Sequence, residues 1–412
     1  MFESMHTMAD VFLFVGVLGL VTSTVYAGLV VRAAFKFFRR KALETSGIFT
    51  PPVSLLKPLH GNEQDIEAHL ETFFHQDYPQ FEILFCARTD SDPGLAAARR
   101  VAARYTHIPT KFLACGASPY PNAKVWSLEC MQAIAKHEIL IVSDSDVSVG
   151  RDYLREVVAP FADERVGLVT CLYRGAALTA PGRHSSTIWS ELEATGMSIE
   201  MSSGVLVADL LEGMQFALGP TMVARRSGLE RIGGFAALGP YHADDFVLGN
   251  MMAADGQKVV LSTFAVDHHI LNASFLSSVA HQIRWMKSTR FSRPKGHLGT
   301  VLTYSMPYGI LAALAALTMH KPMLAAAFFG FAFLTRAALA LAVGGWVVME
   351  RNLPRTVFLY ALRDFMGFLF WCASYTGRQV EWRGEAFQIL SDGKMVITPQ
   401  EPEPEHGAVV TT

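Results

Sequence analysis

The chain has few charged residues. Only 17% of its 412 residues are Asp, Glu, Lys or Arg, whereas 51% are hydrophobic. An ordinary soluble protein carries about 25% charged residues, so this composition excludes a chain that is soluble throughout and predicts membrane segments. The formal net charge is −2. We therefore expect no nucleic-acid partner, because such a partner normally requires a strongly basic face.

Closely spaced cysteines are also missing. The five cysteines stand at positions 86, 115, 130, 171 and 372, with no close pair and no spacing typical of a metal site. This pattern argues against a disulfide framework and against a cysteine-based metal centre. We predict reduced, mostly buried thiols in a domain that faces the cytosol.

A long uncharged run stands near the start of the chain. Val11 to Val31 contains 21 residues without a charge, and five basic residues follow it: Arg32, Lys36, Arg39, Arg40 and Lys41. Residues 1–41 are therefore predicted to be a transmembrane anchor whose C-terminal end faces the cytoplasm. A secretory signal peptide is the alternative, but its positive charge would precede the apolar run.

Residues 42–297 have the pattern of an α/β domain. Short apolar runs alternate with polar helical segments, as in a sheet with crossover helices. We predict strands over 53–56, 81–87, 111–114 and 139–143, and helices through 66–74 and 95–105. The run 139–143 is apolar enough for a central parallel strand, and open α/β sheets bind ligands at the carboxyl ends of such strands.

Aspartates recur after the predicted strands. Asp92 follows the second strand, Asp144 and Asp146 follow the central one, and Asp244 and Asp245 follow a glycine-containing segment further along. Two carboxylates one residue apart suit a divalent cation that carries a diphosphate. Each aspartate taken singly is equally compatible with a turn or a helix cap. Their recurrence in this order favours a ligand site.

These segments resemble a known family. The chain is similar to membrane-bound, inverting family A glycosyltransferases, and most of all to the ceramide glucosyltransferase family with its bacterial hopanoid-biosynthesis branch. The resemblance covers roughly residues 10–300 and includes the segments 56–59, 70–74 and 77–79, Asn122 with Lys124, the Asp-Ser-Asp at 144–146, the glycines at 233 and 234, and the region of Asp245. It implies a Rossmann-like α/β domain with a mixed sheet, flanked by N-terminal and C-terminal transmembrane helices.

The resemblance also implies how a UDP-sugar donor is bound. Asp92 resembles the aspartate that contacts the base and ribose, and Lys124 would bind the nucleotide, since its ammonium reaches phosphate oxygens as a point charge. Asp144 and Asp146 would hold the sugar diphosphate through Mg²⁺ or Mn²⁺. Asp245 resembles the catalytic base, and Asp244 would orient it or raise its pKa.

A further motif lies before the C-terminal third. His281, Arg284 and Trp285 match the closing motif of the family, in which Gln or Arg normally stands where this chain has His281. By the resemblance, all three would close over the donor, with Arg284 on the diphosphate and Trp285 beside the acceptor channel. Packing at the membrane interface is the alternative for Trp285.

The C-terminal third again contains apolar runs. Leu298 to Met319 has 22 uncharged residues, Pro322 to Met349 carries Arg336, and Phe358 to Tyr375 carries Arg363 with Asp364. We expect three or four spanning helices in all, with residues 298–378 as transmembrane or interfacial helices. Arg336 would snorkel, face other helices or line a polar cavity, and Arg363 and Asp364 would neutralise each other. Residues 379–412 are predicted to be a polar, partly disordered tail.

An active site against membrane helices, with a donor that arrives from the cytoplasm, favours a membrane lipid as acceptor, either ceramide or a hopanoid polyol. A methionine-bearing apolar face within residues 197–214 suits a hydrophobic ligand or the edge of the bilayer, and an ordinary buried helix explains it equally well. A processive polysaccharide synthase is the alternative enzyme, which would need more spanning helices. A catalytically inactive lipid-binding or scaffold protein is the non-enzymatic alternative.

Overall fold

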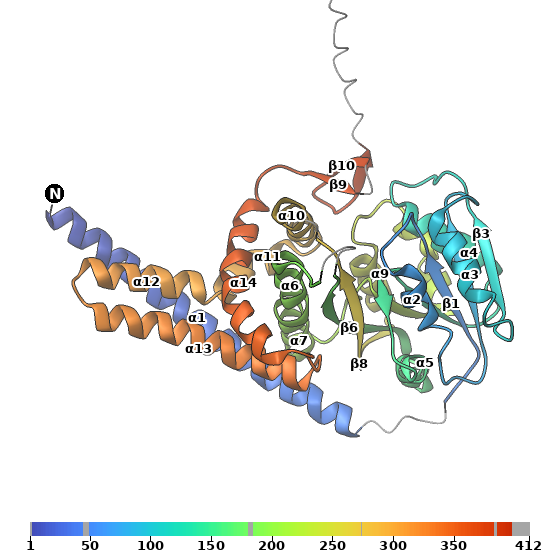
Figure 1. Cartoon of the computed structure of the whole chain (residues 1–412), viewed down its shortest axis with the longest axis horizontal. Helices are drawn as coiled ribbons and strands as arrows, with labels where there is room; N and C mark the ends of the chain where they lie inside the picture. The colour runs from blue at the N-terminus through green and yellow to red at the C-terminus, as the bar shows by residue number, and fades with distance from the viewer. Residues whose placement is uncertain (1, 44–48, 180–183, 273, 383–384, 398–412) are drawn as a thin grey trace, which may run out of the picture.

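A mixed sheet forms the centre of the larger lobe of the molecule (Figure 1). The computed structural model describes residues 2–43, 49–179, 184–272, 274–382 and 385–397. Within them the eight strands of this sheet run in the order β3-β2-β1-β4-β7-β6-β8-β5. Their bounds are β1 Val53–Pro58, β2 Phe81–Ala87, β3 Thr110–Ala114, β4 Ile139–Ser143, β5 Val147–Ser148, β6 Val166–Ala177, β7 Thr221–Arg225 and β8 Lys258–Ile270.

The first half of the sheet is parallel, as the sequence predicts. β1 pairs in parallel with β2 and with β4, and β2 pairs in parallel with β3. Every residue of β1, β2 and β4 is buried, which is why these strands are continuous apolar runs. The predicted bounds of β2 and β4 are confirmed. The carboxyl ends of these strands meet at one edge of the sheet.

Helices cover this half and begin at polar caps. α2 (Ile66–Glu71), α3 (Pro93–Ala102), α4 (Ala123–Ile134) and α5 (Tyr153–Val158) follow the strands. The Asp92 side chain accepts from the amides of Gly94 and Leu95 at the start of α3, and Asn122 caps α4 in the same way through Lys124 and Val125. Each cap satisfies amides that the helix leaves free, so both polar side chains lie at the carboxyl edge of the sheet.

The second half contains three antiparallel pairings. β7 pairs antiparallel with β4 and β6, β6 pairs in parallel with β8, and β5 pairs antiparallel with β8. Short helical elements connect these strands: η1 (Ala159–Ala162), α8 (Arg226–Arg231), η3 (Phe235–Leu238) and α9 (Asp244–Ala254). Asp244 and Asp245 lie in the first turn of α9.

A helix in three parts lies between most of the sheet and the membrane helix α14 (Leu353–Ala373). It consists of α6 (Ile188–Thr195), η2 (Gly196–Met201), which is one π-helical stretch, and α7 (Ser202–Leu211). Met197, Val205, Leu206 and Met214 are buried. These side chains pack as an ordinary helix core, which was one of the alternatives for this apolar face, whereas Leu211 at its end is 63% exposed.

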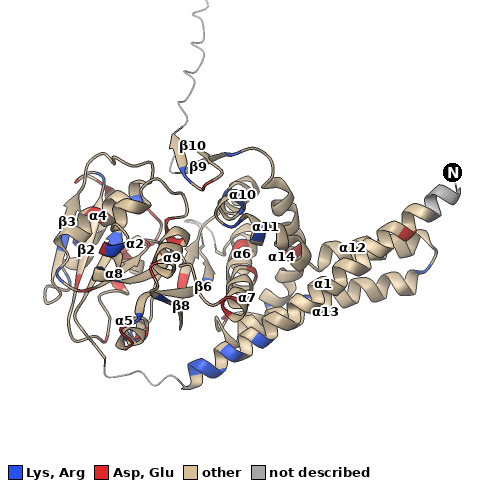
Figure 2. Ribbon diagram, turned by 180° about the vertical axis from the view of Figure 1, so that it is seen from behind, with Lys and Arg blue, Asp and Glu red and all other residues tan. Residues whose placement is uncertain are grey.

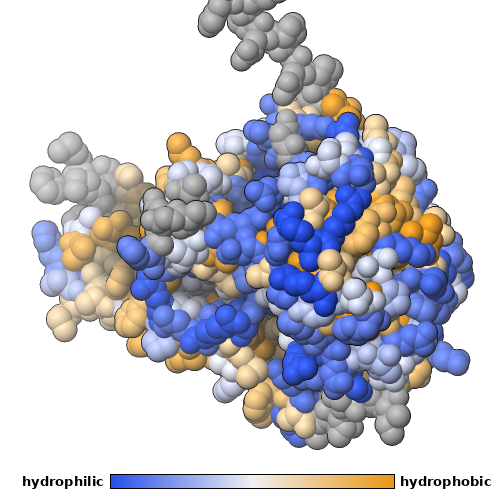
Figure 3. All heavy atoms as spheres, turned by 45° about the vertical axis from the view of Figure 1, so that its right-hand side comes forward, coloured by the Kyte–Doolittle hydropathy of each residue, from blue (hydrophilic) through white to orange (hydrophobic). Residues whose placement is uncertain are grey.

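The apolar helices extend away from the sheet (Figure 1). α1 (Phe2–Leu43), α12 (Met306–Thr318) and α13 (Pro322–Trp346) lie side by side, and α14 (Leu353–Ala373) lies between them and α6. Within the described residues three helices are long and apolar enough to cross a membrane, and α12 joined to the preceding segment 294–303 across a 43° bend would be a fourth. Hydrophobic residues gather over the helices in Figure 3, whereas hydrophilic ones cover most of the larger lobe.

The bend has a specific cause. The predicted run Leu298 to Met319 is divided among α11 (Pro294–Gly299), η4 (Thr300–Thr303) and α12. The carboxylate of Asp364 accepts from the backbone amides of Ser305 and Met306, at 2.9 and 2.8 Å. A new helix start inside an apolar bundle needs such an acceptor, because no water is there to provide one.

The charged residues inside the bundle pair differently from our expectation. Arg363 and Asp364 do not neutralise each other. Arg336 lies 3.1 Å from Asp364 and also donates to the carbonyl of Thr303, whereas Arg363 lies 2.9 Å from Glu200 in η2. Adjacent residues on a helix point to different sides, so Asp364 faces the bundle and Arg363 faces η2. Arg336 thus faces other helices, one of its three predicted environments.

The C-terminal segment also differs from the prediction. Gln379–Trp382 (β9), Glu385–Ile389 (β10) and Met395–Ile397 (β11) form a three-stranded antiparallel sheet, which the predicted polar, partly disordered tail over 379–412 did not include. Four buried residues hold it together: Val380, Phe387, Ile389 and Met395. The acidic stretch from residue 398 onward lies outside the described residues.

The Arg336–Asp364 pair gives a stability prediction. Both side chains are almost fully buried, at 1% and 3% exposure, so Asp364→Asn leaves a buried guanidinium without its counter-ion. We expect a loss of about 3–5 kcal/mol in thermal unfolding of the detergent-solubilised protein. The control is Arg355→Ala, which removes a more exposed ion pair with Glu191 and should cost at most about 1 kcal/mol. Equal stability of the two variants would contradict this role of Asp364.

Candidate active site

A buried lysine joins two of the aspartate segments. Lys124, in the first turn of α4, lies 2.7 Å from Asp144 Oδ1 and 3.9 Å from Asp244 Oδ2. Burial lowers the pKa of Lys124, but the charges of Asp144 and Asp244 outweigh it and hold this pKa above its ordinary value. The ammonium is therefore charged and holds carboxylates from β4 and α9 together.

Asp245 completes this group. A side chain on Gly219 would stand 3.2 Å from Asp245 Oδ2 and 3.7 Å from Asp144 Oδ2, so these two carboxylates flank the same glycine. Burial and the neighbouring charge of Asp244 raise the pKa of Asp245 to about 6. Such a carboxylate is a stronger base than an exposed aspartate and is still largely ionised at neutral pH.

Asp146 follows Asp144 in the turn after β4 and lies next to a histidine. His268 Nε2, from β8, is 3.1 Å from Asp146 Oδ2. Burial raises the pKa of Asp146, but the charges of His268 and Lys57 outweigh it and hold the pKa well below its usual range. Within the described residues Asp146 Oδ1 is buried and has no hydrogen-bond partner. This oxygen atom is therefore available to bind a metal ion or to accept a hydrogen bond from a ligand.

A second lysine lies beneath the aspartates. Lys57 donates to the backbone carbonyl of Asp144 at 2.5 Å and lies 3.8 Å from the centre of the Phe73 ring. Burial lowers the pKa of Lys57 to about 7, against the opposing charges of Asp144 and Asp146. The main-chain bond fixes the turn that presents both aspartates.

Asp92 lies at the same edge of the sheet. Its Oδ2 accepts from the amide of Gly61 at 2.9 Å, and its Oδ1 accepts from Gly94 at 2.8 Å. The carboxylate thus connects the loop after β1 with the start of α3. In this structure its contacts are those of a helix cap that also holds the neighbouring loop.

The closing motif lies on α10 (Phe275–Ser292). His281 Nδ1 is 2.6 Å from Glu193 Oε1, and the His281 ring lies 4.2 Å from the Trp285 ring. Trp285 in turn packs on a small apolar cluster that includes Met197. The charge of Arg284 lowers the pKa of His242, after the larger effect of burial, so Arg284 lies near the loop before α9. His281 therefore holds α10 against α6.

Three residues of the site were not predicted as site residues from the sequence. Lys57 interrupts a buried strand, and a lysine inside an apolar run is a signal that could have been followed. His268 and Glu193 gave no such signal. Glu193 is 1% exposed and also accepts from Asn272 and Ser278. Only the fold shows that these two residues contact Asp146 and His281.

The residues present fit a divalent cation that is shared with a diphosphate. Among the described residues no cluster of three or more His, Cys, Asp or Glu side chains could hold a metal by itself. Mg²⁺ is commonly bound by one or two carboxylates together with substrate phosphates and water. Asp144 and Asp146, whose Oδ1 has no hydrogen-bond partner, supply such a partial set of ligands, and His268 orients Asp146.

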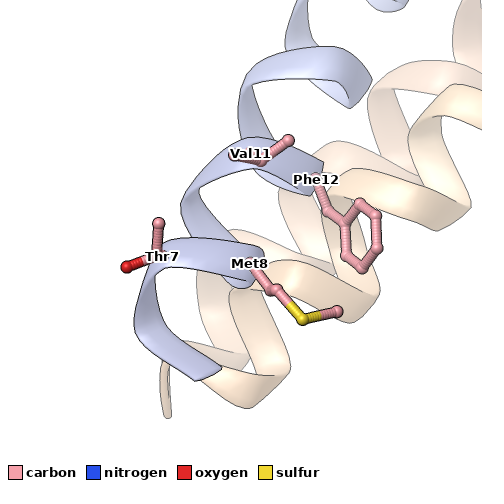
Figure 4. A pocket seen from close by; sticks show the side chains of 4 residues that line it. All are labelled: Thr7, Met8, Val11 and Phe12. Atoms are coloured by element: carbon pink, nitrogen blue, oxygen red, sulfur yellow. The ribbon is translucent and has the colours of Figure 1, made fainter. Parts of the chain in front are cut away.

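A shallow hollow of about 420 Å³ lies far from this site. It is on α1 near the N-terminus, lined by Thr7, Met8, Val11 and Phe12 (Figure 4). Its lining is mostly apolar and carries no ionisable side chain, so it suits lipid chains and not the chemistry of the aspartates.

The chain is similar to curated ceramide glucosyltransferases. Ceramide glucosyltransferase 1 of Caenorhabditis elegans is 22% identical over 363 residues, which cover 84% of this chain and 73% of the relative. Ceramide glucosyltransferase 3 of the same organism is 22% identical, covering 64% and 56%. The enzyme of Komagataella phaffii is 34% identical, covering 28% and 23%. The chain spans less than two thirds of the length of the last two relatives.

Solved structures show similarity at lower identity. A mannosyltransferase from Pyrobaculum calidifontis, in complex with GDP-Man and Mn²⁺, is 18% identical and covers 86% of this chain and 99% of that chain, with a TM-score of 0.47. TarS residues 1–349 from S. aureus, in complex with UDP-GlcNAc, are 14% identical and cover 85% and 98%, with a TM-score of 0.37.

A family model settles the classification. The model of glycosyl transferase family 21 matches residues 13–395, which include the aspartate segments, the closing motif and the membrane helices. The mixed α/β sheet with an Asp-Ser-Asp turn after β4 is the predicted family A glycosyltransferase fold. The chain therefore belongs to glycosyl transferase family 21 and is a glycosyltransferase, which confirms the resemblance to the ceramide glucosyltransferases.

Proposed function

We propose that this protein transfers a hexosyl group, glucose or N-acetylglucosamine, from a UDP-sugar to a hydroxyl of a membrane lipid, with inversion at the anomeric carbon. The acceptor is ceramide or a hopanoid polyol, and the product is a β-glycolipid. One observation carries the proposal: Asp245, with a pKa raised to about 6, and Asp144, from the Asp-Ser-Asp turn, flank the same glycine. A base and a diphosphate-binding turn are thereby brought together.

The donor is bound at the turn after β4. Asp144 and Asp146 would hold Mg²⁺ or Mn²⁺ together with the diphosphate, with His268 orienting Asp146, and the ion would stabilise the charge that develops on the departing UDP. Lys124 supplies a fixed positive charge 2.7 Å from Asp144. Asp92 would contact the base and ribose, and Arg284 would contact the diphosphate from the opposite side.

Asp245 acts as the base in this proposal. As the acceptor hydroxyl attacks the anomeric carbon, its proton passes to the Asp245 carboxylate, a carbon–oxygen bond forms, and the bond from that carbon to the UDP oxygen breaks. A single displacement on an α-linked UDP-sugar gives a β-glycoside. Asp244 assists indirectly, because its charge contributes to the raised pKa of Asp245.

The position of the site supports a lipid acceptor. α6 and α10 carry Glu193, His281 and Trp285, and α14 packs against both of these helices. The membrane helices therefore lie directly behind the closing motif. The matched relatives are ceramide glucosyltransferases, whose name specifies a lipid acceptor. Trp285 would line the path between the membrane and Asp245.

The basic cluster on α1 supports a cytoplasmic orientation. Its residues lie at the end of α1 next to the catalytic lobe (Figure 2), and positive residues accumulate on the cytoplasmic side of spanning helices. Lys321, in the turn between α12 and α13, lies at the opposite end of the bundle. We therefore place the catalytic lobe in the cytoplasm and this turn outside.

Cysteine labelling tests the orientation. In a Cys372→Ser background, an impermeant thiol reagent added to intact cells should label Lys321→Cys and miss Cys115. After permeabilisation both positions should react, because Cys115 is partly exposed and Lys321 is exposed. Labelling of Cys115 in intact cells would overturn the proposed topology.

Metal removal tests the role of the turn. EDTA should abolish transfer, and Mg²⁺ or Mn²⁺ should restore it. A second measurement is independent of turnover: with UDP present, electron paramagnetic resonance should detect bound Mn²⁺ in the wild type and none in Asp146→Ala. His268→Ala should weaken Mn²⁺ binding by roughly 10-fold to 100-fold. Equal Mn²⁺ binding by the wild type and Asp146→Ala would remove Asp146 from the metal site.

Substitution of the base tests the reaction itself. Asp245→Asn keeps the size of the side chain but removes the proton acceptor, so UDP binding should persist while kcat falls by roughly 10² to 10⁴. Asp244→Asn is the matched control, with a smaller loss. An α-linked product, or normal turnover of Asp245→Asn beside an inactive Asp244→Asn, would refute the assignment.

The pH dependence of activity tests the relation between Asp244 and Asp245. A base must be deprotonated, so activity should fall as the pH decreases through the Asp245 pKa of about 6. Asp244 raises this pKa through its charge, and Lys124 lowers it. In Asp244→Asn the acid limb should therefore move to lower pH. A limb that stays in place would show that another group sets it.

A further inference from the structure

The loop before α9 is paired with the C-terminal sheet. Met395 donates its amide hydrogen to the carbonyl of Pro240 at 2.7 Å, and His242 donates to the carbonyl of Gly393 at 3.3 Å. Between them Tyr241 and Lys394 form an antiparallel bridge. Residues 240–242 thus lie along β11 and the turn before it as a short additional strand. This strand ends two residues before Asp244 and three before Asp245.

The same small sheet is attached to α10. Phe291 packs against the four buried residues that hold the sheet together, and Lys287 donates to the carbonyl of Gln379 at 3.0 Å. The ring of His242 lies 3.0 Å, Nδ1 to Oγ, from Ser288. Three separate parts of the chain therefore contact one another directly: the loop 240–242 before α9, the helix α10 and the C-terminal sheet (Figure 1).

On its other side the loop is fixed by the catalytic lobe. Asn122 donates its backbone amide to Gly239 and its side-chain amide to the carbonyl of Tyr241, at 3.2 and 3.0 Å. A side chain on Gly239 would overlap the ring of Tyr120, so the loop is in close contact there. The loop is thus held from two sides, by the cap of α4 and by the C-terminal sheet.

We propose that the sheet β9–β11 and the helix α10, to which it is attached, together position the catalytic base, and that His242 connects them to the base: its backbone amide binds Gly393 of the sheet and its ring contacts Ser288 of α10. The proposal rests on the role of Asp245 proposed above. Without the sheet, residues 240–242 lose the main-chain bonds to Gly393 and Met395, and α9 begins from a loop with more freedom. A base displaced by about 1 Å can cost roughly 100-fold in rate, so the sheet contributes to catalysis without contacting the donor or the acceptor.

Undocking the sheet tests the proposal. Phe387 is 2% exposed in the centre of the sheet, and a sheet this small depends on its few buried side chains. Phe387→Ala in the full-length protein should raise hydrogen exchange at residues 240–245 and lower kcat by roughly 10-fold to 100-fold, while the Kd for UDP stays within about twofold. Gln388→Ala, at an exposed position of the same strand, should change neither.

His242 provides a second, local test. His242→Leu removes the contact with Ser288 but leaves the main-chain bonds of the loop, so kcat should fall while the Kd for UDP is unchanged. His242→Asn should restore part of the rate, because an amide reaches a position close to that of Nδ1. Ser288→Ala should reproduce the loss seen with His242→Leu, and the double variant should lose no more than either single one.

The outcomes separate this proposal from the proposed function. If Phe387→Ala raises exchange across residues 385–397 but leaves exchange at 240–245 and kcat as in the wild type, the sheet does not position the base. An unchanged kcat in His242→Leu would likewise remove His242 from this role. Failure of the wild type to form any glycolipid would instead refute the proposed function, and the exchange data would still report whether the sheet holds the loop.

Discussion

The contact of Lys124 with Asp144 and Asp244 is the interaction on which the site depends most. It brings the end of β4 and the start of α9 together, at 2.7 and 3.9 Å from one ammonium. Without this charge, carboxylates from two distant segments would be close together in a partly buried place and would repel each other. Removing one partner of a buried ion pair costs about 3–5 kcal/mol, so Lys124 is a structural requirement in addition to its proposed role in binding the donor.

Other pairs of opposite charges also join segments that are far apart in the sequence. Lys57 and His268 offset Asp144 and Asp146 on the far side of the turn, and Glu193 fixes the helix of the closing motif through His281. Inside the membrane bundle Arg336 and Asp364 play a comparable part, because their pairing permits a helix to start where the chain bends. In both places opposite charges from distant segments determine the local backbone.

The sequence predicted the parts of the fold that depend on local patterns. β2 and β4 were predicted to the residue because a strand buried on both faces is a continuous apolar run with polar ends. Asp92, Asp144 and Asp146 were predicted as site residues because they follow predicted strands, and parallel strands end at one edge of the sheet. Ion pairs between residues far apart in the sequence were not predicted. Examples are His268 with Asp146 and Glu193 with His281. Arg363 and Asp364 were expected to pair with each other, but they pair with Glu200 and Arg336. The small sheet β9–β11 was missed because its strands are short and its core consists of four residues.

The most direct test of the account is the fate of the sugar. Membranes that contain the protein would be incubated with radiolabelled UDP-glucose and, separately, UDP-N-acetylglucosamine, and the label would be followed into a solvent-extractable lipid fraction and an insoluble fraction. The account predicts label in a lipid with a single sugar in β-linkage. Label in an insoluble polymer, as from a processive polysaccharide synthase, or no transfer from either donor, would contradict it.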